Sequence, residues 1–186
     1  MDTAVDPRTL RWINRPALYT VDEDSVLLET TPHTGFHSLT FNEICANGLV
    51  LEPMTGFSFS ARMRYHFEGP ENECGIFLQE NAGHWMKGGI QDRRENLKLS
   101  CMVYDNGYGD EALREIGSAV KEMSLRVLYW NGNVRFQYSF GGEQYSDMRW
   151  MHFADSSVAV TPGIFACSPG SDVFDCRFTD LCLQKI

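Results

Sequence analysis

The sequence predicts an all-β protein, folded as a sandwich or a barrel. Short runs recur in which apolar and polar residues alternate, as they do in strands with one buried face. Segments rich in Gly, Pro and Asn separate these runs at about the spacing of strands in such folds. With 43% hydrophobic and 22% charged residues, the 186-residue chain has an ordinary globular composition and is not expected to be disordered.

The domain organisation is predicted from the length and from the first residues. Residues 1–11 are expected to form an N-terminal extension, and residues 12–186 are expected to form one sandwich domain. The extension has charges and no apolar stretch, which indicates neither a secretion signal nor a membrane anchor, so we expect a cytoplasmic protein. The formal net charge of −9 opposes binding to nucleic acids or anionic membranes, because such binding needs clustered Lys and Arg.

Strands are expected wherever the alternation is regular. The clearest strand is Phe57–His66, in which every second residue from Phe57 onward is apolar. Two shorter strands are expected earlier in the chain, at Tyr19–Val21 and Ser25–Thr30.

The stretch Cys74–Tyr104 predicts three strands joined by two turns. In its middle run, Trp85, Lys87 and Gln91 lie on one face of the strand, and a Met and an Ile lie on the other. The Met and Ile are expected in the core, so the Trp, Lys and Gln are expected on an open outer face. Aromatic, amide and ammonium groups gathered on an open sheet face are typical of a ligand platform.

The second half of the chain is predicted in the same way. Asp105–Asp110 is expected to be a Gly-rich loop, and Glu111–Val120 is the one segment expected to be helical or irregular. Asn131-Gly132, between two apolar runs, predicts a tight hairpin because these residues tolerate the positive φ angles that its turn needs. The last strands are expected at Gly163–Cys167 and Phe174–Leu183.

Cysteine and histidine patterns do not predict a metal site. None of the six cysteines forms a Cys-x-x-Cys pair and four lie in apolar strand patterns, so they are expected to be buried thiols, with a disulfide, a metal or a nucleophile as alternatives. His33 and His37 are four apart, but Pro32 and Gly35 oppose the helix that would place both on one side. No phosphate loop or dinucleotide motif is found, and no cofactor is predicted.

Several motifs resemble those of an uncharacterised concanavalin A-like family that includes the regulation-of-enolase protein and belongs to the lectin/glucanase superfamily. They are Trp12-x-Asn14-x-Pro16, Cys74-Gly75-Ile76-Phe77, the strand with Trp85, Lys87, Gly89 and Ile90, and Gly163-Ile164-Phe165-Ala166-Cys167. The resemblance covers nearly the whole chain, from about Trp12 to Leu183. It implies a concanavalin A-like jelly-roll sandwich of two antiparallel sheets, and by analogy of fold it implies sugar binding.

These observations predict a non-catalytic module that binds a carbohydrate, or another small polar ligand, on one sheet face. Sugar sites combine an aromatic ring, which stacks on the apolar face of a pyranose, with polar groups that bond to the hydroxyls. The predicted ligand-binding residues are His37, Arg64, Glu73, Trp85, Lys87, Gln91, Tyr104 and Tyr108. Trp130 and Trp150 are expected to be structural.

Two alternatives stay open. A sugar-processing enzyme, a hydrolase or an epimerase, would use Glu73 with His37 or Lys87 as acid and base, and these groups would have to reach one substrate atom. The sequence lacks the alternating carboxylates of a retaining glucanase strand, so no catalytic residue is assigned. A protein-interaction domain would instead have its aromatic face covered by a partner or by a second copy of the chain, as in a homodimer.

Overall fold

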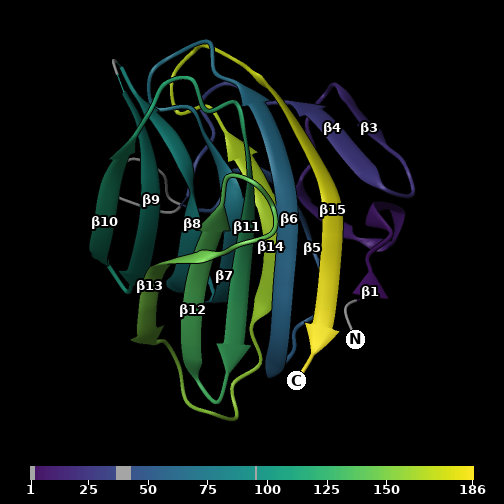
Figure 1. Ribbon diagram of the computed structural model, residues 1–186, viewed down its shortest axis with the longest axis vertical. Helices are drawn as coiled ribbons and strands as arrows, with labels where there is room; N and C mark the ends of the chain where they lie inside the picture. The colour runs from purple at the N-terminus through teal and green to yellow at the C-terminus, as the bar shows by residue number, and fades with distance from the viewer. Residues whose placement is uncertain (1–2, 37–42, 95) are drawn as a thin grey trace.

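The computed structural model describes residues 3–36, 43–94 and 96–186, which form two β-sheets packed face to face (Figure 1). Sheet A has the strand order β13 (Ser146–His152), β12 (Asn133–Ser139), β11 (Glu122–Trp130), β6 (Gly56–His66), β15 (Asp175–Lys185), β4 (Ser25–Glu29) and β3 (Tyr19–Val21), with β1 (Thr3–Ala4) also paired to β15. Sheet B has the order β10 (Tyr108–Ile116), β9 (Asn96–Asp105), β8 (His84–Arg93), β7 (Glu73–Asn81), β14 (Thr161–Cys167), β5 (Asn47–Val50) and β2 (Arg11–Asn14).

The chain passes repeatedly from one sheet to the other. The strands β7 to β10 lie together in sheet B, the chain then crosses to sheet A for β11 to β13, and β14 and β15 return to sheets B and A in turn. All ladders between these strands are antiparallel. The predicted fold, an all-β concanavalin A-like jelly-roll sandwich of two antiparallel sheets, is therefore confirmed.

The main core lies between the two sheets. The alternation predicted for β6 is observed, since its odd-numbered residues from Phe57 to Tyr65 are buried and their neighbours are more exposed. Ile76, Met86 and Ile90 of sheet B belong to the same buried cluster. Burial of apolar surface on this scale is the main stabilising contribution of the fold.

The Asn131-Gly132 hairpin is also confirmed. It joins β11 to β12, and both residues have positive φ, 50° at Asn131 and 75° at Gly132. A Cβ atom on Gly132 would in addition run into the backbone oxygen of Ala154. Glycine is thus required here both by the turn and by the close approach of another segment.

The expectation of a helical or irregular segment at Glu111–Val120 is wrong, because residues up to Ile116 belong to β10. This strand pairs with β9 over nine residues. The chain reverses through Asn106 and Gly107, both with positive φ (45° and 102°), so a second Asn-Gly turn replaces the expected loop. The local composition favours a helix, but pairing with the neighbouring strand outweighs that preference.

The N-terminal residues contact sheet A. Thr3 lies opposite Leu183 in the ladder between β1 and β15, and η1 (Pro7–Thr9), a short 3₁₀ helix, leads on to β2. The Asp6 side chain accepts a hydrogen bond from the Arg8 backbone N–H (2.9 Å) at the start of η1. The division of the chain at residue 12 stays a prediction. Within the described residues, no helix has the length and apolar character needed to cross a membrane.

Candidate functional site

Trp85, Lys87 and Gln91 lie on the face of sheet B that points away from the main core, as the alternation of β8 predicts. Met86 and Ile90 belong to the cluster between the sheets, whereas Trp85 belongs to a second buried cluster. We call this second cluster the covered face. Its buried apolar members are Phe36, Ala46, Val50, Phe77, Trp85, Tyr104, Phe165 and Cys167.

The prediction that Trp85 lies on an open outer face is wrong, since only 1% of this residue is exposed. Its indole stacks on Tyr104 (ring centroids 5.2 Å apart) and lies 4.9 Å from the ring of Phe36. Phe36 belongs to the segment that precedes β5, and this segment is held in place by a hydrogen bond from Cys45 N to Gly35 O (2.8 Å). Strand periodicity identifies the face of a side chain, but it does not reveal that a distant segment covers that face.

A buried ion pair between Lys87 and Glu73 lies on the covered face. The residue directly opposite Glu73 on β8 is Gln91, and Lys87 lies four residues before Gln91 along that strand. Between them Gly75 and Gly89 lie directly opposite each other, and because neither has a side chain the lysine can extend over both. The ammonium also lies 5.1 Å from the ring centre of Phe36, within the range of a cation–π interaction.

The electrostatics of this pair keep Lys87 charged. Burial by itself favours the neutral amine, but the adjacent Glu73 carboxylate outweighs burial, and the pKa of Lys87 lies above its usual value. Lys87 is therefore an ammonium at neutral pH and is unable to act as a general base there. Lys87 and Glu73 are in contact with each other, while His37 lies outside the described residues, so the acid and base roles of the enzyme hypothesis stay a prediction.

Two polar atoms on the covered face are buried without a hydrogen-bond partner among the described residues. They are Oε1 of Glu73 and Nε1 of Trp85. Burying such groups is costly unless they are bonded, and an ordered water is a common partner. The binding role predicted for Glu73, Trp85, Lys87, Gln91 and Tyr104 stays a prediction, because these side chains are gathered together but enclosed.

The other predicted residues lie apart from this group. Tyr108 is 82% exposed at the start of β10. Arg64 lies on sheet A, opposite Glu122 of β11 and Arg177 of β15. The predicted set is therefore divided between both sheets and does not form one site.

The expectation that Trp130 and Trp150 are structural is wrong, since they are 61% and 72% exposed. Both lie on the outer face of sheet A. Leu125, Val127 and Tyr129 of β11 point into the core, so Trp130 points outward by alternation. Trp150 lies opposite Arg135, which is likewise on the outer side of β12. The same alternation, applied to these two strands, would have found this surface from the sequence.

We call the surface formed by Leu128, Trp130, Arg135, Trp150 and Ile186 the tryptophan face. These residues line an open hollow of about 290 Å³. Arg135 donates two hydrogen bonds to Asp147, of 2.7 and 2.9 Å, and its guanidinium lies 5.7 Å from the ring centre of Trp150. These bonds hold the pKa of Asp147 below its usual value. The tryptophan face thus has two accessible rings and a cation in a fixed orientation.

The described residues offer little for metal or thiol chemistry. Among them no group of three or more His, Cys, Asp or Glu side chains is placed to hold a metal ion. The six cysteines form no disulfide with one another, and Cys74, Cys101, Cys167 and Cys176 are buried. Burial raises the pKa of Cys101 to about 12, so this thiol is protonated and unreactive at neutral pH.

Comparison with known proteins finds relatives that match most of the chain. The family model described as "Protein of unknown function (DUF1349)" matches residues 12–186. The Saccharomyces cerevisiae protein named Regulation of enolase protein 1 is 30% identical over 161 residues, which cover 85% of this chain and 80% of that protein. A crystal structure described as a functionally unknown protein from Saccharomyces cerevisiae has a TM-score of 0.90 at 25% identity, covering 97% of this chain and 98% of the other.

More distant solved structures share the fold alone. The GH43 protein BlXynB from Bacillus licheniformis has a TM-score of 0.77 at 14% identity, and the Bacteroides ovatus protein described as Xyloglucan PUL GH43B has a TM-score of 0.75 at 16% identity. Each similarity covers 100% of this chain but 39% of the larger protein. The same sandwich therefore also occurs as one part of longer chains.

Proposed function

The chain belongs to the family described as a protein of unknown function, DUF1349, and we propose that it is a non-catalytic module that binds carbohydrate on the tryptophan face. The observation that carries the proposal is the exposure of Trp130 and Trp150 on one outer sheet face. Large rings are normally buried when their role is packing, so two exposed indoles on one face favour a binding role.

The spacing of the two rings supports an oligosaccharide ligand. Trp130 is on β11 and Trp150 is on β13, with β12 between them, so the two strands lie about 10 Å apart. Their partners on β12, Asn133 and Arg135, are two residues apart, which adds an offset along the strand. The indoles are thus too far apart to pack on each other, and each can stack on a separate sugar ring of one chain.

The polar groups beside the rings support the same ligand class. Asp147 holds the Arg135 guanidinium beside Trp150, so little side-chain freedom is lost when a guanidinium N–H bonds to a sugar hydroxyl. Asn133, which also lines the hollow, adds an amide close to Trp130. Apolar rings next to oriented donors match a sugar, which presents an apolar face and a hydroxyl edge.

Affinity electrophoresis and calorimetry with a panel of soluble polysaccharides test the proposal. The panel contains xylan, xyloglucan, mixed-linkage β-glucan, galactan and starch. We expect at least one of them to bind, and Trp130→Ala and Trp150→Ala each to weaken its Kd about tenfold or more. The matched control is Phe140→Ala, which removes a 51%-exposed ring just beyond the far end of β12 and is expected to leave binding unchanged.

The result that overturns the proposal is equally specific. Binding to none of the panel, or binding that persists in the Trp130→Ala, Trp150→Ala double variant, removes the tryptophan face as a carbohydrate site. Because both side chains are exposed, the melting temperatures of these variants are expected to stay close to that of the unmodified protein.

A second candidate function is the regulation of enolase, which the 30% identity to Regulation of enolase protein 1 favours. In this case the protein acts by direct contact with another protein. We also propose that it forms a homodimer. Purified enolase assayed at increasing concentrations of this protein is expected to change its rate. An unchanged enolase rate at a saturating concentration of this protein rejects a direct effect. A molar mass of 21.2 kDa from light scattering, which is that of the monomer, rejects the homodimer.

We propose a cytoplasmic location for this activity. Four buried cysteines without disulfides support a reducing compartment, where thiols persist. Fractionation of cells followed by immunoblotting is expected to place the native protein in the cytosolic fraction. Recovery with membranes or in the medium contradicts this proposal.

A further inference from the structure

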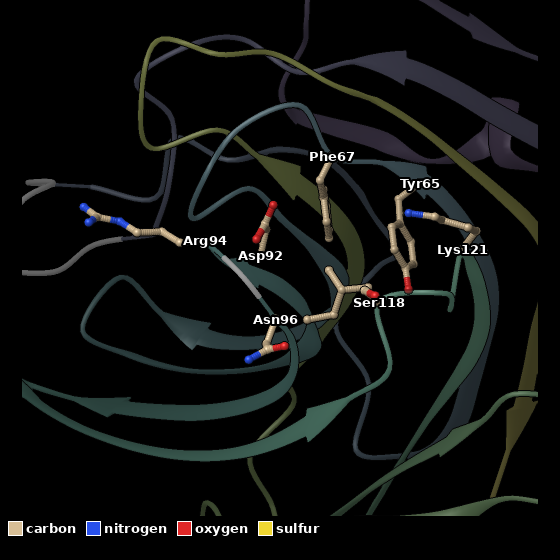
Figure 2. A pocket seen from close by; sticks show the side chains of 8 residues that line it. Tyr65, Phe67, Asp92, Arg94, Asn96, Ser118 and Lys121 are labelled. Atoms are coloured by element: carbon tan, nitrogen blue, oxygen red, sulfur yellow. The ribbon is translucent and has the colours of Figure 1, made fainter.

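A separate pocket of about 150 Å³ lies at one end of the sandwich (Figure 2). It is formed where the end of β6, the turn between β8 and β9, and the connection from β10 to β11 come together. One wall is aromatic, since the rings of Tyr65 and Phe67 stack with their centroids 4.7 Å apart. No residue of this pocket belongs to the tryptophan face or to the covered face.

Three charged residues line the pocket, namely Asp92, Arg94 and Lys121. Figure 2 shows the Arg94 guanidinium directed away from the other side chains, which leaves Asp92 and Lys121 as the two opposite charges beside the aromatic wall. Asp92 lies near the end of β8, and Lys121 lies just before β11. Neither side chain takes part in an ion pair or a hydrogen bond within the described part of the chain. Figure 2 shows Lys121 and Asp92 on opposite sides of the Phe67 ring, with the lysine directed toward the aromatic wall. A carboxylate and an ammonium are thus available at two separate positions.

A buried amide adjoins the acidic wall. Asn72 is 1% exposed, and its backbone carbonyl oxygen accepts a hydrogen bond from Asp92 N (2.9 Å). Both side-chain polar atoms of Asn72 lack a hydrogen-bond partner among the described residues. Asn72 immediately precedes β7 and lies next to the pocket without being one of its lining residues. A buried side-chain amide normally has a hydrogen-bond partner.

We propose that this end pocket binds a small zwitterion of the α-amino acid class. The ammonium of the ligand pairs with Asp92, its carboxylate pairs with Lys121, and its side chain lies against Tyr65 and Phe67. A volume of about 150 Å³ suits a compact metabolite better than an oligosaccharide. A ligand with both charges matches both walls, whereas a simple anion or cation leaves one wall unpaired.

Calorimetry and thermal shift with each of the natural amino acids in turn test this proposal. We expect at least one of them to bind. For that amino acid, capping the amine with an acetyl group or the carboxylate as an amide is expected to weaken binding about tenfold or more, because each removes one charged hydrogen bond. Equal binding of the capped forms overturns the proposal.

Substitutions locate the binding site. Asp92→Asn and Lys121→Met are each expected to weaken the affinity about tenfold or more. The matched controls Asp24→Asn and Lys185→Met remove exposed charges outside the pocket and are expected to leave it unchanged. Binding of none of the amino acids, or binding that tolerates the Asp92→Asn, Lys121→Met double variant, contradicts the proposal. The polysaccharide assay with Trp130→Ala is independent, so failure at one site is distinguishable from failure at the other.

Discussion

The Lys87 ammonium contacts the Glu73 carboxylate on the covered face of sheet B, although Glu73 lies opposite Gln91, four residues further along β8. The lysine spans this offset over Gly75 and Gly89, which leave the intervening position on both strands without side chains. The pair is nearly closed to water, with side-chain exposures of 10% for Lys87 and 3% for Glu73. Its energetics therefore differ from those of a surface ion pair.

Removing one partner of this pair is expected to destabilise the protein strongly. Lys87→Met leaves a buried carboxylate and Glu73→Gln leaves a buried ammonium, and each is expected to lower the free energy of unfolding by about 3–5 kcal/mol. Urea titration measures the change. The matched control is Lys98→Met, which breaks a more exposed pair with Glu115 and is expected to cost at most about 1 kcal/mol. Equal losses in the control and the buried variants contradict the prediction.

The stability contributed by Lys87 is expected to persist until strongly alkaline pH. Because Glu73 raises the pKa of Lys87, this contribution is fully present below the unfolded-state pKa of about 10.4 and is lost as the pH rises through the higher folded-state pKa. The difference in unfolding free energy between the unmodified protein and Lys87→Met should be constant from about pH 8 to about pH 10 and should shrink above it. A difference that instead grows as the pH rises toward about 10.4 indicates a lowered folded-state pKa and refutes this assignment.

The facing glycines of β7 and β8 are expected to tolerate no side chain. A Cβ atom on Gly89 would run into the backbone oxygen of Cys74, and one on Gly75 into that of Gly88. Gly89→Ala is therefore expected to lower the free energy of unfolding by about 1–3 kcal/mol. Gly117→Ala is the control, since a Cβ atom there would have no other atom within 4 Å and the expected effect is within about 0.5 kcal/mol. Chemical denaturation of the two variants measures both changes in the free energy of unfolding.

Trp85 and Trp130 are expected to respond in opposite ways to the same substitution. Trp85→Ala removes a ring buried against Phe36 and Tyr104 and is expected to cost about 3–5 kcal/mol of unfolding free energy. Trp130→Ala removes an exposed ring, so its expected cost is within about 0.5 kcal/mol. Thermal and urea unfolding compare the two variants. A larger loss of unfolding free energy in Trp130→Ala than in Trp85→Ala contradicts the assignment of Trp85 as buried and Trp130 as exposed.

Several features of the fold could be predicted because they depend on local pattern. The alternation in Phe57–His66 determines the buried and outer faces of β6, and Asn131-Gly132 determines a hairpin by its positive φ angles. The position of β10 could not be predicted from composition, because its strand conformation depends on pairing with β9. The turn at Asn106-Gly107 was the available signal for this strand.

For the candidate sites, the sequence by itself determined that Trp85 and Lys87 share one side of their strand, because side chains alternate along any extended chain. Only the tertiary structure decided that Phe36, from the segment before β5, covers that side while Trp150 and Trp130 remain open on the other sheet. The reason is physical: the direction of a side chain is set by its own backbone, whereas its exposure depends on segments brought to it by folding.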